Sequence, residues 1–135
     1  MLLRKLNAKG GRRAVRDFDL LDGGDSFGVT ISGDENQMRM FEPKAAAYVE
    51  RIASIFAAHS LGIKTWVSFE PVFSEQEVYH AIEQCSFIDF YKIGKLNYHP
   101  STIDWAAFGR ECERLCKEYG RNYYIKEDLR KEMEM

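Results

Sequence analysis

The chain has 135 residues, of which 45% are hydrophobic, 13% are aromatic and 30% are charged, and its formal net charge is −2. This length and composition predict one folded domain over residues 1–135 and exclude a disordered chain. The small net charge argues against a general polyanion binder, and no apolar run approaches the roughly 18 residues that a membrane-spanning helix needs.

The N-terminal part of the sequence predicts a strand and a helix with a basic character. Leu2–Leu6 is expected to form a strand or part of one, and Arg13–Leu21 has apolar residues at helical spacing. Six basic residues precede the first acid, Asp17: Arg4, Lys5, Lys9, Arg12, Arg13 and Arg16. With Gly10 and Gly11 among them they suit a phosphate or carboxylate, and the alternative is a solvated helix face.

Two strand–helix units follow in the chain. Phe27–Ile31 has strand composition, and the helix after it is expected between Pro43 and Gly62. Lys64–Glu70 is the next predicted strand, ended by Pro71, and Ser74 begins a capping box for the helix that follows. The first of these helices has apolar residues and a histidine at helical spacing: Ala45, Tyr48, Val49, Ile52, Ile55, Phe56 and His59.

The C-terminal part repeats the same pattern. Phe87–Ile93 and Asn122–Lys126 are predicted strands, and Asp104 is the predicted N-cap of a helix that ends at Gly120. The tail from Asp128 to Met135 is expected to be a short frayed helix.

Alternating strands and helices predict an α/β fold with a parallel sheet of βα repeats. A full (β/α)₈ barrel uses about 250 residues, or roughly 30 per unit, so this chain holds about four units. We therefore expect an open half-barrel with two unpaired edges. Such edges, and an inner face exposing side chains such as Trp66 or Tyr91, predict a homodimer. The alternative is that the basic N-terminal segment or the Asp128–Met135 tail folds over the opening.

Candidate site residues stand near the carboxyl ends of the predicted strands, where parallel α/β proteins bind their ligands. A carboxylate and several lysines there suit an anionic ligand, and the alternative is a buried ion pair between Glu70 and Lys92. These rim candidates are Thr30, Ser32, Ser68, Glu70, Lys92, Lys95, Asn97 and Lys126.

The cysteines and histidines do not predict a metal site. Cys112 and Cys116 lie on the apolar face of one predicted helix, which favours buried free thiols over metal ligands, and Cys85 is on another element. His59, His80 and His99 are not spaced as ligands of one metal. Free thiols and the absence of a secretory signal after Met1 predict a reducing, cytoplasmic location.

Four segments together resemble radical S-adenosylmethionine (SAM) proteins, most closely the branch related to spore photoproduct lyase. Lys9–Phe18 (KGGRRAVRDF) resembles the exit of that family's third strand and its third helix. TWVSFEPV at 65–72 resembles the fifth strand, DFYKIGKLNY at 89–98 the sixth, and YYIKEDL at 123–129 the segment after the barrel. The resemblance implies the second half of a partial, six-stranded TIM-like barrel.

The chain departs from that family in its cluster motif. Radical SAM proteins bind a [4Fe–4S] cluster through a CxxxCxxC loop after the first strand, and this sequence has no such loop. It also lacks the family's first two strands. The parent enzyme would use SAM and a [4Fe–4S] cluster, whereas neither is expected to be bound by this chain alone.

The resemblance implies which residues contact SAM. The family's lysine at the end of the third strand corresponds to Lys9, and its fourth-strand hydroxyl residue corresponds to Thr30 or Ser32. An ammonium pairs with a carboxylate, and a hydroxyl hydrogen-bonds a ribose. Glu70, Lys95 and Asn97 also match family positions, without an assigned role.

Three functions are consistent with these features. The first is the C-terminal half of a radical SAM enzyme, which contributes part of the SAM and substrate site but is inactive alone. The second is a non-enzymatic module that pairs with itself or with a missing N-terminal half. The third is a small α/β enzyme that uses Glu70 and Lys92 as acid and base, although no catalytic residue is assigned. No membrane partner is expected, and a nucleic-acid partner is implied only by the family resemblance.

Overall fold

The computed structural model describes residues 5–8, 25–32, 48–97 and 101–134, and these form an α/β fold. The helix predicted at Arg13–Leu21 and the helix start at Pro43 lie outside these residues. Five strands form one sheet in the order β1-β2-β3-β4-β5, and every neighbouring pair is parallel. The strands are Lys5–Ala8 (β1), Ser26–Ile31 (β2), Lys64–Phe69 (β3), Phe90–Ile93 (β4) and Tyr123–Ile125 (β5). The prediction of parallel βα repeats is confirmed.

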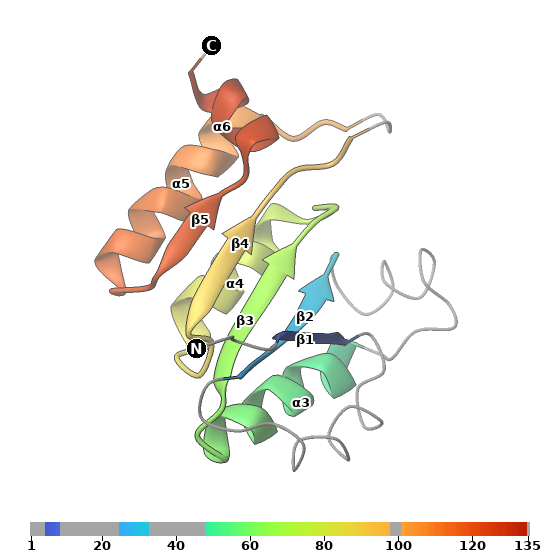
Figure 1. Ribbon diagram of the computed structural model, residues 1–135. Helices are drawn as coiled ribbons and strands as arrows, with labels where there is room; N and C mark the ends of the chain where they lie inside the picture. Colours follow the sequence, from blue (N-terminus) through green and yellow to red (C-terminus); the bar gives the residue numbers. More distant parts are fainter. Residues whose placement is uncertain (1–4, 9–24, 33–47, 98–100, 135) are drawn as a thin grey trace.

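Three helices cover one face of this sheet (Figure 1). They are Tyr48–Ser60 (α3), Glu75–Gln84 (α4) and Trp105–Glu118 (α5), and a fourth helix, Glu127–Met133 (α6), packs against α5. Apolar side chains from the sheet and the three helices form one buried core. Figure 1 also shows β1 drawn at a steep angle to β3 and β4, so the sheet curls at this edge.

The predicted helix boundaries follow local backbone chemistry. Ser74 accepts a hydrogen bond from the Glu77 amide, and Asp104 accepts one from the Ala107 amide at 3.1 Å, so both predicted N-caps are confirmed. The turn after α3 contains Gly62 at φ +79°, a left-handed conformation that glycine adopts without strain.

The predicted boundaries of three strands were wrong by one to three residues. β4 begins at Phe90 rather than Phe87, because the Ile88 amide donates to Cys85 O and thereby closes a turn after α4. β5 is Tyr123–Ile125, one residue shorter at each end than predicted. β1 extends to Ala8 instead of ending at Leu6.

The apolar pattern predicted for α3 is borne out only in part, because Ile55 is fully buried and Ile52 packs against the core while two other positions are exposed. Val49 and Phe56 are 67% and 56% exposed, whereas Arg51 and Ser54 are buried against the sheet. The Arg51 guanidinium donates to Thr30 O at 2.6 Å, at the carboxyl end of β2. A buried charge that is hydrogen-bonded in this way occupies a core position that an apolar pattern does not reveal.

The C-terminal helix is anchored rather than frayed. Leu129 of α6 is fully buried, and Met133 lies so close to Gly109 of α5 that a Cβ there would be 2.5 Å from its sulfur. Arg130 also donates to Glu113 at 3.0 Å. The tail therefore covers α5 and does not fold across the open face of the sheet.

Candidate functional site

The sheet face opposite the helices carries most of the predicted rim residues. In a strand, alternate side chains point to opposite faces, and register partners in parallel strands point the same way. Thr30, Ser68, Lys92 and Tyr124 are successive register partners across β2, β3, β4 and β5. They form one polar row across four strands, so Ser68 and Lys92 lie on the same face of the sheet.

Trp66 lies in the neighbouring row and packs flat across β2. A Cβ added to Gly28, its register partner, would lie 2.1 Å from two carbons of the indole. The Lys92 ammonium stands 4.2 Å from the indole ring centroid, which is a cation–π contact. The absence of a side chain at Gly28 therefore leaves room for the Trp66 ring, and the Lys92 ammonium lies over that ring.

This packing overturns the expectation that Trp66 or Tyr91 is exposed on the open face. Trp66 is only 9% exposed, because Gly28 lets its ring lie close against the sheet. Tyr91 is fully buried on the helix-covered side, where its hydroxyl donates to Cys85 O at 2.7 Å. Among the described residues, the Trp66 Nε1–H is buried and has no hydrogen-bond partner.

A second polar group lies at the carboxyl ends of β3 and β5. The Lys126 ammonium forms an ion pair with Glu70 and donates to the Ser68 hydroxyl at 3.1 Å. The Glu70 side chain passes over Gly94 toward Lys126, and a Cβ added at Gly94 would lie 2.9 Å from the Glu70 carboxyl carbon. Glycine on each side of β3 thus makes room for one large side chain.

These two groups border an open hollow of about 450 Å³. Its lining combines two ammonium groups, a hydroxyl, a phenol, an indole and one carboxylate, which can bind a ligand with anionic or polar oxygen atoms. The lining residues are Trp66, Ser68, Lys92, Tyr124, Lys126 and Glu127.

The remaining predicted site residues lie elsewhere. Lys95 forms an ion pair with Glu132 at 2.8 Å, and Asn97 donates to Asp128 at 2.7 Å, so both fasten α6 to the loop after β4. Ser32 is buried beyond the end of β2, and its carbonyl accepts from the Phe73 amide at 3.0 Å. Lys9 lies outside the described residues.

Sequence reasoning missed the parts played by Trp66, Tyr124 and Gly28 in this site. A glycine inside a strand often marks close approach of another group, and Gly28 within Phe27–Ile31 carried that signal. Tyr124 carried none, because an aromatic residue in a strand is ordinary.

The described cysteines do not fit an iron–sulfur cluster. Cys85, Cys112 and Cys116 are buried among core side chains on the helix-covered side. Within the described ranges, no three metal-ligating side chains lie together.

We expect slow thiol labelling of the native protein. Burial raises the pKa of Cys116 to about 11 and also raises the pKa of Cys112 and Cys85, so these sulfurs stay protonated and weakly nucleophilic at pH 8. Titration with a chromogenic disulfide should show all three thiols reacting at once in denaturant and only slowly without it. Fast labelling of Cys112 or Cys116 with the fold intact would contradict the core assignment.

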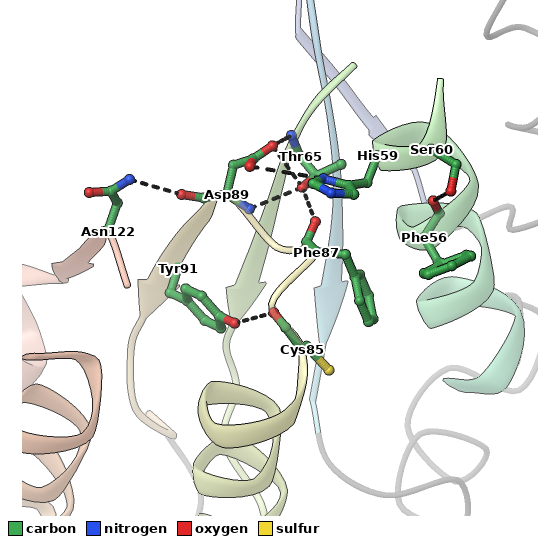
Figure 2. A network of polar contacts seen from close by, with 9 residues as sticks. All are labelled: Phe56, His59, Ser60, Thr65, Cys85, Phe87, Asp89, Tyr91 and Asn122. Carbon is green, nitrogen blue, oxygen red and sulfur yellow. Dashed lines mark hydrogen bonds and ion pairs between the residues drawn. The ribbon is translucent and has the colours of Figure 1, made fainter. Parts of the chain in front are cut away.

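A different polar network lies at the amino ends of β3 and β4 (Figure 2). Asp89 accepts a hydrogen bond from the Thr65 amide at 2.8 Å, and its own amide donates to the Thr65 hydroxyl at 3.0 Å. His59 of α3 stands 4.0 Å from the Asp89 carboxylate. These bonds tie the two strand starts to the loops around them, and the network lies at the end of the sheet opposite the hollow.

No family model, curated protein or solved structure matches this chain. None of the helices in the described part of the chain is both long enough and apolar enough to cross a bilayer.

Proposed function

We propose that this chain is the second half of a barrel of the radical SAM type, and that its open sheet face contributes part of a SAM and substrate site. The proposal rests on the four resembling segments and on the topology. In the described part of the chain the strands follow one another in consecutive order and the three long helices lie on one face. This arrangement is typical of barrels, whereas a doubly wound sheet reverses its order and carries helices on both faces.

The buried, unpartnered Trp66 N–H is the observation that carries the proposal. A buried donor without an acceptor destabilises a protein by about 1–3 kcal/mol, and native structures rarely leave one unexplained. An acceptor on whatever covers this face, a ligand or the missing half of the barrel, removes that penalty. This unsatisfied donor therefore supports a ligand or a partner on this face of the sheet.

Each residue has a role in the proposed site. Lys9 and the hydroxyl of Thr30 or Ser32 serve the carboxylate and ribose of SAM, and Lys92 and Lys126 bind anionic oxygens of the substrate. Ser68 and Glu70 position the Lys126 ammonium. Lys95 and Asn97 act indirectly, by holding α6. SAM supplies a radical only when a reduced cluster cleaves it, so this chain alone is inactive. Its free thiols fit a location in the reducing cytoplasm.

Ligand binding to the isolated chain tests the proposal. We expect S-adenosylhomocysteine, a stable analogue of SAM, to perturb amide signals in nuclear magnetic resonance at the carboxyl ends of β2 and β3. Thr30→Val should weaken this binding about threefold to tenfold, consistent with the loss of one hydrogen bond. Thr102→Val is the matched control, because Thr102 is exposed in the loop before α5.

Two results would contradict the proposal. One is the absence of any perturbation at millimolar analogue, and the other is equal weakening by both threonine variants. Anaerobic reconstitution adds an independent check, because uptake of four irons by this chain would refute its description as a half without the cluster site.

A non-enzymatic assembly module is the second candidate. The observation that favours it is an open hollow of about 560 Å³ along β5, the last strand of the sheet. An open strand edge can pair with another chain, and this property is independent of SAM.

A further inference from the structure

The β5 edge of the sheet has main-chain groups directed outward. Asn122 O accepts from β4 and the Lys126 amide donates to β4, so alternate residues of this segment bond inward. In a parallel pair, the peptide groups of the intervening residues, Tyr123 and Ile125, then point away from β4. The hollow along this edge is lined by Tyr123, Tyr124, Ile125, Glu127 and Arg130.

The opposite edge belongs to β1. All four residues of β1 pair with β2, and within the described ranges no strand pairs with its other side. β1 and β5 are similar in length, four and three residues, and they run in the same direction. Both edges therefore have the polarity needed to continue a parallel sheet.

A two-fold axis parallel to the strands brings these edges together without reversing any strand. It places β5 of one copy beside β1 of the other, in parallel, and does so twice, so no edge remains open. A two-fold pairing of β5 with β5 would instead be antiparallel. It would leave both β1 edges open and both polar faces uncovered.

The charges near the two edges favour the same arrangement. The sequence around β1 is basic, with six cationic residues before the first acid at Asp17. Residues 127–134, which follow β5, contain four acids against two bases. A β5–β1 pair joins a strand with an acidic flanking sequence to a strand with a basic flanking sequence, whereas a β5–β5 pair joins two acidic flanks.

We infer that two copies of this chain close a ring of ten parallel strands, with β5 of each copy paired to β1 of the other. The inference rests on the half-barrel description in the proposed function and identifies what covers its open face. In this ring the rows that contain Trp66, Lys92 and Lys126 line an interior shared by both copies.

Cross-linking between different variants tests this arrangement. Asn7→Cys lies in β1 as the register partner of Gly28, and Tyr124→Cys lies in β5 at a position that is 54% exposed. Each variant is oxidised alone and in an equal mixture, with Asn7→Ser and Tyr124→Ser as matched controls. Circular dichroism establishes that every variant is folded.

We expect a disulfide-linked dimer in the mixture, at least five times more abundant than in either cysteine variant alone. Sedimentation equilibrium of the unaltered chain should give twice its 15.7 kDa at micromolar concentration. Cross-linking of Tyr124→Cys by itself would overturn the ring in favour of β5–β5 pairing, and a 15.7 kDa species would overturn assembly altogether. If either of these results is obtained and S-adenosylhomocysteine still binds, the ten-stranded ring is refuted and the proposed function stands. If the ring forms but S-adenosylhomocysteine does not bind to it, the proposed function is refuted and the ring stands.

Discussion

Phe108→Ala is expected to lower the free energy of unfolding by about 3–5 kcal/mol, the range for removing a fully buried phenylalanine. Phe108 of α5 is 0% exposed, and its ring lies 5.7 Å from that of Trp105 and 5.8 Å from that of Tyr79 on α4. Its removal leaves a cavity between the two helices that packed rings cannot fill. Urea denaturation followed by circular dichroism measures the change.

Phe56→Ala is the matched control for this prediction. Phe56 is 56% exposed on α3 and makes one edge-to-face contact with Phe87, with ring centroids 5.4 Å apart. We expect a loss of about 1 kcal/mol or less, because little apolar surface is returned to water. Equal losses from the two variants would mean that α3 and α5 are not packed as described.

Gly28→Ala is expected to lower the free energy of unfolding by about 3 kcal/mol, the upper part of the usual range for an overpacked site. The added methyl would lie 2.1 Å from the Trp66 indole, so either the ring or β2 must move. The loss of this close packing should also change the fluorescence of Trp66, which is measured in a Trp105→Phe background so that Trp66 is the remaining tryptophan.

A double-mutant cycle isolates the cause. In a Trp66→Ala background the indole is absent, so Gly28→Ala should then change stability by less than about 1 kcal/mol. A penalty of the same size in both backgrounds would place the strain in the β2 backbone and not in contact with the ring.

The repeat of strands and helices could be predicted because it is local. Strand composition, the cap residues Ser74 and Asp104, and the glycines that end two helices all act within a few residues of the feature they specify. Alternation along a strand likewise fixes which face each residue occupies, but the register that aligns Ser68 with Lys92 is set between strands.

The contacts within the candidate site could not be predicted in the same way. Lys126 is 56 residues from Glu70 in sequence, and no local signal selects it over Lys92 as the partner in the ion pair. Lys95 and Asn97 were assigned to the rim because they follow β4, but α6 packs back along α5 and binds both. On α3, the apolar pattern was misleading at Val49 and Phe56, because a hydrogen-bonded arginine takes a core position.

The consecutive order of the sheet has a consequence for synthesis on the ribosome. Each strand pairs with the strand before it in the chain, so the sheet can grow from β1 toward β5 as residues emerge. The Trp66 ring can pack on Gly28 as soon as β3 pairs with β2. The ion pair of Glu70, in contrast, forms only after Lys126 has been synthesised. The hollow is therefore the last part of the sheet to be completed in a nascent chain.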